Sequence, residues 1–364
     1  MSLSVGIVGL PNAGKSTLFN ALTRAGAAVA SYPFTTIDPN TGVVPVPDRR
    51  VDQLAAIFTP LRTVPATVTF TDIAGLVRGA SRGEGLGNQF LGHIRTTDAL
   101  VLVVRAFTDP DVTHVEGSVD PVRDLDLLEL ELALADQESV NRRLERAERT
   151  SRLVKEKDEE LLDTLRRAHQ HLDGGAPLRT MGLSAEQQEQ LRDLSLLTAK
   201  PALVVVNVEE RHVARPQALV DRLRKRAAQS GDETLVISAR IESEIAELDS
   251  ADRQAFLESL GLAEPGLDRL AHSAYRLLRL QTFFTGGPKE VHAWTLRAGG
   301  TAIDAAGAVH SDFARGFIRA EVIAAETLIA AGSYAAAREQ GQVRVEGRDY
   351  VVQDGDVLYI RFNV

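Results

Sequence analysis

Eight residues near the start of the chain constrain its fold more than any other part of the sequence. Residues 9–16 read Gly-Leu-Pro-Asn-Ala-Gly-Lys-Ser. They follow a short β-prone run, Val5–Val8, and precede a helical run that begins at Thr17. The spacing G-x-x-x-x-G-K-[ST] in this setting is the phosphate-binding loop pattern, in which a glycine-rich turn aims backbone N–H groups at an anion. The pattern therefore predicts a strand–loop–helix unit that binds a nucleotide.

The side chains of this loop have separate roles. Lys15 is placed to reach the β- and γ-phosphates and is a candidate catalytic residue, while the Ser16 hydroxyl is placed to ligate Mg²⁺. Magnesium is therefore the cofactor that the loop implies. The residues of this loop expected to bind the nucleotide are Asn12, Ala13, Gly14, Lys15, Ser16 and Thr17.

The chain has 364 residues, a formal net charge of −9 and no cysteine. Its length is enough for two or three domains. The charge argues against a generally basic coat for nucleic acid, although it is compatible with a local basic patch. The lack of cysteine excludes disulfides and thiolate metal sites. No apolar run is long enough to span a bilayer and the N-terminus has no signal-peptide pattern, so we expect a cytoplasmic protein that binds neither membranes nor DNA.

The order of β-prone and helical runs predicts an α/β domain with a helical insertion. Residues 1–122 alternate the two kinds of run, as a parallel sheet requires. Residues 123–198 have leucines at helical spacing followed by dense mixed charge, which predicts a long solvated helical hairpin. Residues 199–281 return to the α/β pattern with the strands Ala202–Val206 and Thr234–Ile237. The hairpin is thus predicted to interrupt one P-loop nucleotide-binding domain.

Residues 282–364 have a different character. A linker is predicted at Thr285–Pro288 and a short helix at Ala302–Val309. The predicted strands are Val291–Leu296, Gly316–Val322, Val343–Val345, Tyr350–Val352 and Val357–Phe362. One helix on a small mixed sheet indicates an α+β module of ubiquitin-like type.

The hairpin carries a row of cations from Arg142 to Lys157. Arg142, Arg146 and Arg149 follow one another at steps of four and three residues, so they share one helix face. Two interpretations are open: a solvated helix face, or a ridge that binds RNA or an acidic partner.

Candidate switch residues lie at the end of one predicted strand and in the segment that precedes it. Asp72-Ile73-Ala74-Gly75 ends the strand Val68–Asp72. Asp72 can hold a water on Mg²⁺, and the Gly75 N–H can meet the γ-phosphate. Thr35 and Thr36 lie before that strand, where a threonine would ligate Mg²⁺ only while the γ-phosphate is present.

A second group of motifs faces the nucleobase. Asn207-Val208-Glu209-Glu210 follows a buried strand, where GTPases carry N-K-x-D. Glu210 occupies the position of the aspartate that accepts hydrogen bonds from guanine, and Val208 replaces the lysine that flanks the base. Adenine offers neither of those donors, so the sequence removes the main argument for guanine. The expected base-side residues are Asn207, Val208, Glu210, Ser238 and Ala239.

Together these motifs resemble the YchF/Obg-like ATPase family, within the TRAFAC class of P-loop NTPases. The resemblance covers essentially the whole chain, and its specific stretches are Tyr32–Asn40, Asp72–Asn88, Asn207–Glu210, His292–Thr295, Gly316–Glu321 and Asp354–Val357. It implies an OBG-type G domain and a C-terminal TGS domain with the β-grasp fold.

The same resemblance implies a function. It implies a cytosolic ATPase that converts ATP to ADP and phosphate with Mg²⁺, acts as a nucleotide-state switch, and associates with the ribosome and its RNA, on the large subunit or the whole particle. It also assigns Mg²⁺ ligation to Thr36 rather than Thr35, beside Ser16.

The sequence lacks the usual water-orienting residue at the position where Ras-like GTPases carry it. Leu76 stands where Ras-like GTPases carry a glutamine, and leucine cannot polarise water. The resemblance implies two substitutes. His114 matches a loop histidine of relatives, with a plain surface histidine as the alternative. Asn12 matches an asparagine that binds K⁺ in cation-activated relatives, with a loop-capping residue as the alternative.

Other functions remain open on the sequence. The same fold could serve a GTPase if Glu210 tolerates guanine. It could also serve a ribosome-binding module with little hydrolysis, an interpretation that Leu76 favours and that Lys15, Ser16 and Asp72 weigh against. A metabolic kinase is weakly supported, since no second substrate pocket is evident.

Overall fold

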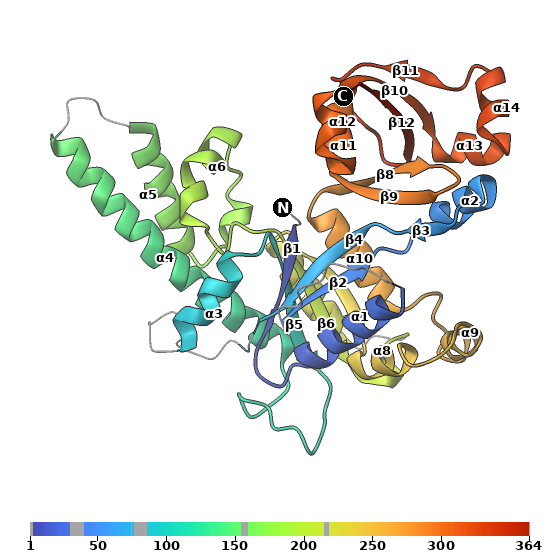
Figure 1. The fold of residues 1–364 in the computed structure, drawn as a ribbon. Coiled ribbons are helices and arrows are strands. Elements are labelled where there is room, and N and C mark those ends of the chain that lie inside the picture. The colour runs from blue at the N-terminus through green and yellow to red at the C-terminus, as the bar shows by residue number, and fades with distance from the viewer. Residues whose placement is uncertain are drawn as a thin grey trace. The chain divides into compact units, whose positions relative to one another are not determined.

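A computed structural model describes residues 3–29, 40–73, 75, 86–153, 159–214 and 218–363. The chain divides into two compact units (Figure 1). The first comprises Met1–Gly42 and Thr69–Leu270, and the second comprises Val43–Val68 and Ala271–Val364.

The first unit is built on a sheet with the strand order β2-β4-β1-β5-β6-β7. The pairings of β4 with β1, β1 with β5, β5 with β6 and β6 with β7 are all parallel. The expected P-loop architecture is confirmed. Its elements are β1 (Ser4–Gly9), α1 (Lys15–Val29), β2 (Thr41–Pro45), β4 (Thr67–Asp72), α3 (Leu86–Arg95), β5 (Ala99–Ala106), α4 (Pro121–Leu153), α5 (Glu159–Asp173), α6 (Ala185–Leu191), β6 (Ala202–Val208), α7 (Ala218–Gln229), β7 (Glu233–Ile237), α8 (Ala239–Ile245) and α9 (Ser250–Ser259), with 3-10 turns at Leu178–Thr180, Arg192–Leu194 and Glu210–His212. The boundaries between the two units fall within β2, within β4 and within α10 (Gly266–Leu277).

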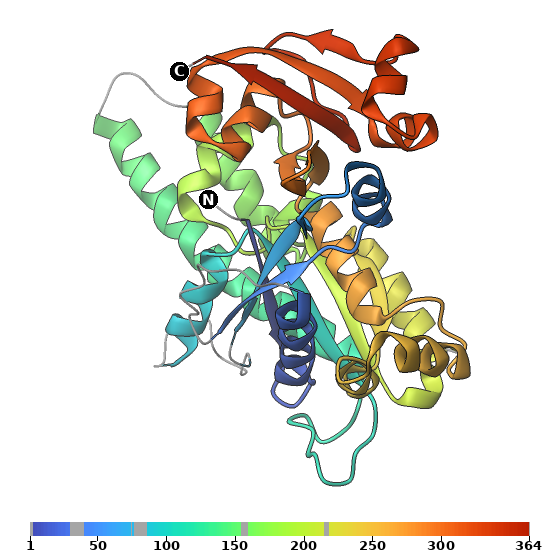
Figure 2. The same ribbon diagram turned by 45° about the vertical axis from the view of Figure 1, so that its right-hand side comes forward.

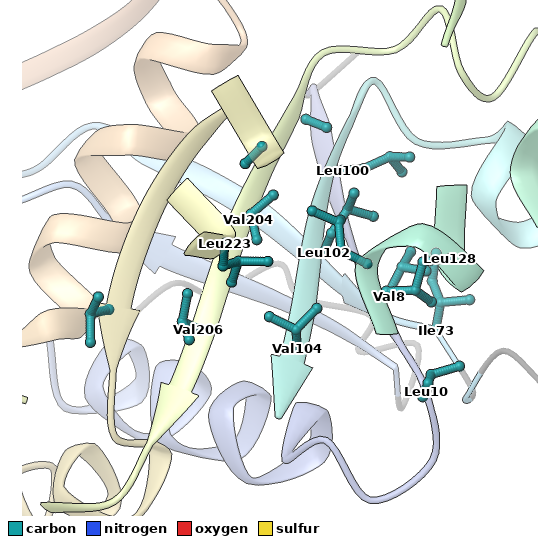
Figure 3. Close-up of a cluster of buried hydrophobic side chains, with 14 of the residues drawn as sticks. Val8, Leu10, Ile73, Leu100, Leu102, Val104, Leu128, Val204, Val206 and Leu223 are labelled. Atoms are coloured by element: carbon teal, nitrogen blue, oxygen red, sulfur yellow. The ribbon is translucent and has the colours of Figure 1, made fainter. Parts of the chain in front are cut away.

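The core of this unit lies on both faces of its central strands. Along β5 every residue from Ala99 to Arg105 is buried, because helices cover the sheet on either side. Figure 3 shows one of these clusters, in which β5 and β6 side chains meet those of α4 and α7. The residues in contact there include Leu100, Leu102, Val104, Leu128, Val204, Val206 and Leu223.

The helical insertion has a small core of its own. Helices α4 and α5 pack together around Val140, Leu165 and Ala168, with α6 beside them. At the base of the insertion the fully buried Asp136 accepts hydrogen bonds from the N–H groups of Leu197 and Thr198, at 2.8 and 2.7 Å. Although α4 has 33 residues, no helix in the described part of the chain is long and apolar enough to cross a bilayer.

The second unit is built on a mixed sheet with the order β11-β10-β12-β8-β9-β3. Strands β10 and β12 pair antiparallel, whereas β12 pairs parallel with β8. Helix α11 packs Ala302 and Ala305 against this sheet, as the predicted ubiquitin-like module requires. The elements are α2 (Arg49–Phe58), β3 (Arg62–Val64), β8 (Leu280–Gly286), β9 (Glu290–Arg297), α11 (Ala302–Val309), α12 (Ser311–Arg315), β10 (Phe317–Ala324), α13 (Ala325–Ala331), α14 (Tyr334–Glu339), β11 (Arg344–Glu346) and β12 (Asp356–Phe362).

The extent of this unit differs from the expected 282–364. Residues 43–68, expected in the first part of the nucleotide-binding domain, belong to it, and it resumes at Ala271. The reason is strand pairing: β3 pairs parallel with β9, Thr63 opposite Val291. Helix α2 also packs in this unit, where Phe58 meets the ring of Tyr359 edge-on at 6.5 Å between centroids.

Two local predictions were wrong. The expected linker at Thr285–Pro288 is a hairpin turn, because β8 extends to Gly286 and pairs antiparallel with β9. The expected strand Tyr350–Val352 is only an isolated bridge between Val351 and Thr301.

We expect Asp136→Ala to lower the free energy of unfolding by about 2–4 kcal/mol, because buried N–H groups lose a charged acceptor. Urea denaturation measures the change. The control is Glu138→Ala, an exposed position on the same helix with a long 3.6 Å contact to Arg142, for which we expect a change below about 0.5 kcal/mol. Equal effects of the two substitutions would contradict the role given to Asp136.

Candidate functional site

The loop between β1 and α1 has the backbone shape that phosphate binding needs. Gly14 has φ of +93° and Asn12 has φ of +63°. A Cβ at Gly14 would lie 2.2 Å from Asn207 Nδ2, so any side chain there would collide with the base-side residue. Helix α1 begins at Lys15, directly after this turn, and its free N–H groups therefore face the same place.

Lys15 is buried at the foot of the loop, with 7% of its surface exposed. Its Nζ donates to the carbonyl of Leu10 at 2.9 Å. Burial lowers the pKa of Lys15 to about 8, and the nearby Asp72 offsets part of this shift. The ammonium is therefore poorly compensated until a phosphate supplies negative charge.

Asp72 and Ser16 lie together beside this lysine. The Ser16 hydroxyl donates to Asp72 Oδ2 at 3.1 Å. The other carboxylate oxygen, Oδ1, is buried and has no hydrogen-bond partner in the described residues. Burial raises the pKa of Asp72, against the effects of Ser16 and Lys15. A hydroxyl and an unsatisfied carboxylate oxygen are donors of the kind that Mg²⁺ takes, so the residues fit that ion.

The switch residues are only partly described. Gly75 lies close to the phosphate loop, because a Cβ there would be 3.2 Å from Lys15 Nζ. Thr35, Thr36 and Leu76 lie outside the described residues.

Asn207 connects the phosphate loop to the base-side loop. Its amide Nδ2 donates to the carbonyl of Ala13 at 3.0 Å, and its Oδ1 accepts from the N–H of Ala239 at 3.0 Å. Ala239 is the first residue of α8, and Ser238 precedes it in a buried position. Both bonds are buried, so the amide holds two loops from distant parts of the sequence at a fixed separation.

A cavity of about 1420 Å³ opens beside this connection. Its walls come from the phosphate loop, the segment after β5, the segment after β6, the start of α8 and the end of α9. The lining residues are Asn12, Gly14, Thr17, Phe107, Thr108, Asp109, Val112, Asn207, Val208, Glu209, Glu210, Arg211, Ala214, Ser238, Ala239, Arg240, Glu258, Ser259, Leu260 and Gly261. A cavity of this size exceeds the usual volume of a small-molecule site.

Comparisons with known proteins agree with this geometry. A family model described as "50S ribosome-binding GTPase" matches residues 4–172, and the model YchF-GTPase_C, described as a protein of unknown function, matches residues 280–363. A Bacillus subtilis (strain 168) protein named "Ribosome-binding ATPase YchF" is 52% identical over 369 residues, covering 100% of both chains. The chain belongs to the YchF family. The resemblance carried by the motifs is thereby confirmed.

Other YchF relatives match over the same extent. Proteins of the same name from Haemophilus influenzae and Escherichia coli O157:H7 are 49% and 48% identical, each over 100% of both chains. The solved structure titled "Structure of the Schizosaccharomyces pombe YchF GTPase" superposes with a TM-score of 0.90 at 35% identity, covering 99% of this chain and 98% of that one. The YchF fold therefore spans both units.

The two base-side substitutions occupy different surroundings. Val208 is almost fully buried and packs in the apolar core, although it also lines the cavity. Glu210 is exposed at the start of a 3-10 turn and lines the cavity. A lysine at position 208 would therefore disturb the core, whereas position 210 is free to vary in length.

His114 and Asn12, the two candidates for assisting hydrolysis, are differently placed. The His114 ring is buried, with Nε2 2.9 Å from Asp124 Oδ2 and Nδ1 accepting from the N–H of Glu116 at 3.0 Å. Both ring nitrogens are thus occupied, and His114 does not line the cavity. Asn12 does line it, and its Nδ2 donates to the carbonyl of Thr113 at 3.0 Å.

Glu209 is a site residue that the sequence reasoning missed. Its Oε1 accepts from both the N–H and the hydroxyl of Thr108, at 3.1 and 2.7 Å. These bonds lower the pKa of Glu209. No local sequence pattern predicts a contact between residues that are 101 positions apart. The one sequence signal for Glu209 was its position at the end of a buried strand.

The pKa of Lys15 predicts proton uptake on nucleotide binding. At pH 8 about half of the free protein carries a neutral lysine, and phosphate should restore its charge, so we expect uptake of about 0.5 proton per nucleotide. The affinity should fall as the pH rises above 8. Calorimetry in buffers of different ionisation enthalpy measures the uptake. Lys200→Arg, at another lysine of lowered pKa away from the cavity, is the control and should leave it unchanged; zero uptake in the wild-type protein would contradict the assignment.

Asn207→Ala removes both bonds between the two loops. We expect nucleotide affinity to fall about tenfold, equivalent to about 1.4 kcal/mol. Asn207→Asp should bind nucleotide no more tightly than Asn207→Ala, because its second carboxylate oxygen would face the carbonyl of Ala13. Gln137→Ala, which removes an amide–carboxylate bond in the hairpin, is the control. Fluorescent-nucleotide titration measures all three, and wild-type affinity in folded Asn207→Ala would show that the amide does not matter for binding.

Proposed function

We propose that this chain hydrolyses ATP to ADP and phosphate and that the bound nucleotide controls its association with the ribosome. The observation that carries the proposal is the Asn207 amide, which joins a complete phosphate loop to a base-side loop in which Glu210 replaces the guanine-reading aspartate. Membership of a family whose curated relatives are named ribosome-binding ATPases supports it.

In this proposal the chain's own groups position the triphosphate. The N–H groups of the loop and of the first turn of α1 bind the β- and γ-phosphate oxygens, and Lys15 balances their charge. Ser16 and Thr36 would hold Mg²⁺, with Asp72 acting through a water. When bound there, the ion would supply positive charge that offsets the negative charge of the triphosphate.

The attacking water needs a group other than Leu76. The ring of His114 is tied to Asp124, so its use as a water-orienting residue requires that this contact opens. Asn12 is placed at the cavity, and its amide oxygen is the candidate ligand for K⁺. We therefore favour Asn12 with K⁺ as the assisting pair, which faster hydrolysis in KCl than in NaCl would support.

The base side supports adenine over guanine. An exposed glutamate can turn away from the adenine ring, which has no paired N–H donors for it, and no lysine flanks the base. A GTPase of the same fold is the second candidate, kept open by the length of Glu210, which can still reach guanine.

We expect ATP to bind about tenfold more tightly than GTP, equivalent to about 1.4 kcal/mol. Glu210→Asp at the exposed position should reduce that preference, and Val208→Lys with Glu210→Asp should shift it toward GTP, at some cost in stability because Val208 is buried. Competition titration measures the ratio. Lys15→Ala should lose tight binding of both nucleotides. A wild-type preference for GTP would reject the ATP assignment.

The hairpin is the proposed ribosome contact. Its arginines are exposed but partly neutralised: Arg142 lies 3.6 Å from Glu138, and Arg149 lies 3.3 Å from Glu145. Exposed pairs of this kind contribute little and exchange readily for phosphate contacts. We propose that this face and the C-terminal unit dock on ribosomal RNA.

Reversing Arg142, Arg146 and Arg149 to Glu should weaken ribosome association by about tenfold or more at low salt, because phosphate contacts are lost. ATP affinity should stay unchanged. The matched control reverses Arg222, Arg224 and Lys225, three exposed cations of α7. Pelleting with ribosomes across a salt series measures the effect, and equal pelleting of both triple variants would leave the hairpin as a solvated face.

A further inference from the structure

We propose that Arg105 is a positioning residue of the nucleotide site, which folds the loop between β5 and α4 into the wall that holds Asn12. The inference rests on the proposed function, because it concerns the same cavity. The sequence offered one signal for it: Arg105 is a cation at the end of the otherwise apolar strand Ala99–Ala106.

The burial of Arg105 is the first step of the argument. Only 3% of the residue is exposed, although a guanidinium is costly to bury without partners. Its register partner on β6 is Asn207, so it lies at the carboxyl edge of the sheet beside the site. If Arg105 contributed only to packing, an apolar residue of similar size could replace it with little loss of stability. The role of Arg105 therefore depends on the groups to which it donates hydrogen bonds.

Every hydrogen bond that this guanidinium makes within the described residues goes to one loop. Nε donates to the carbonyl of Phe107 at 3.1 Å, and Nη2 donates to the carbonyl of Val112 at 2.9 Å. The charged centre also lies 4.4 Å from the ring centroid of Phe107. The third nitrogen, Nη1, has no hydrogen-bond partner among the residues that the structure describes. Arg105 thus joins the two ends of residues 107–112.

The folded loop meets the site at two points. The carbonyl of Thr113 accepts from Asn12, and Thr108 donates to Glu209 on the base side. Figure 1 and Figure 2 show the segment between β5 and α4 reaching out beyond the ends of the strands. A segment of this kind packs against little of the core. The hydrogen bonds of the buried Arg105 at its base can therefore hold it in one conformation.

Asn12 links the conformation of the loop between β5 and α4 to the conformation of the phosphate loop. Its backbone is in the left-handed region, which asparagine adopts more readily than most residues but less readily than glycine. The bond from its side chain to Thr113 stabilises that conformation only while the loop is correctly placed. Arg105 therefore acts on nucleotide binding through Thr113 and Asn12, without touching the nucleotide.

The first test compares two arginine substitutions. Arg105→Met should lower ATP affinity by about tenfold. Arg95→Met is the matched control, because Arg95 also donates to backbone carbonyls of the same unit, those of Leu194 and Ser195, but lies away from the cavity. It should keep wild-type affinity, even if both variants are destabilised. Equal affinities of Arg105→Met and Arg95→Met would overturn the inference.

The second test is a double-mutant cycle of Arg105→Met with Asn12→Ala, which measures the coupling between the two substitutions in ATP affinity. A purely structural role of Arg105 would give no such coupling. Once Asn12 is truncated, Arg105→Met should cost about threefold or less in ATP affinity, since its route is already broken. Fully additive effects would overturn the inference. If Arg105→Met does not fold, Arg105→Lys takes its place in the cycle, because it keeps the buried charge but loses the planar fork. A wild-type protein that binds no ATP would reject the proposed function instead.

Discussion

The two hydrogen bonds of the Asn207 amide set the separation between the phosphate loop and the base-side loop, and the cavity depends on that separation. The bonds are possible because β1, β5, β6 and β7 run parallel, so that the segments after them meet at one edge of the sheet. The close approach of this amide also leaves room only for glycine at position 14. Geometry at one residue is thus linked to the order of strands in the whole sheet.

The electrostatics of the site follow from the same burial. Lys15 is buried and Asp72 is half-buried, and burial shifts the pKa of each in the direction that favours its neutral form. The two groups do not fully compensate each other in the free protein. Phosphate oxygens and a divalent cation carry the charges that this pair lacks, so binding energy is available from groups already held in place.

The sequence predicted those features that depend on neighbours in the chain. The loop at residues 9–16, the buried strands and the motif at Asn207 are local patterns, and the structure contains each of them. It could not predict the contacts of Glu209 with Thr108 or of Arg105 with Val112, because these depend on which strands lie side by side and how a long loop returns. The turn at Thr285–Pro288 was misjudged for a related reason: glycine and proline mark a hairpin and a linker alike.

Residues 43–68 give the second unit an unusual connection to the first. The chain leaves the first unit through β2, contributes α2 and β3 to the second, and returns through β4, which ends at Asp72. Only later does it pass over again at Ala271. Part of the second unit is therefore inserted in the polypeptide between the phosphate loop and Asp72, so this unit is not a purely C-terminal domain. Cutting the chain before Ala271 would leave β3 without β9, the strand with which it pairs.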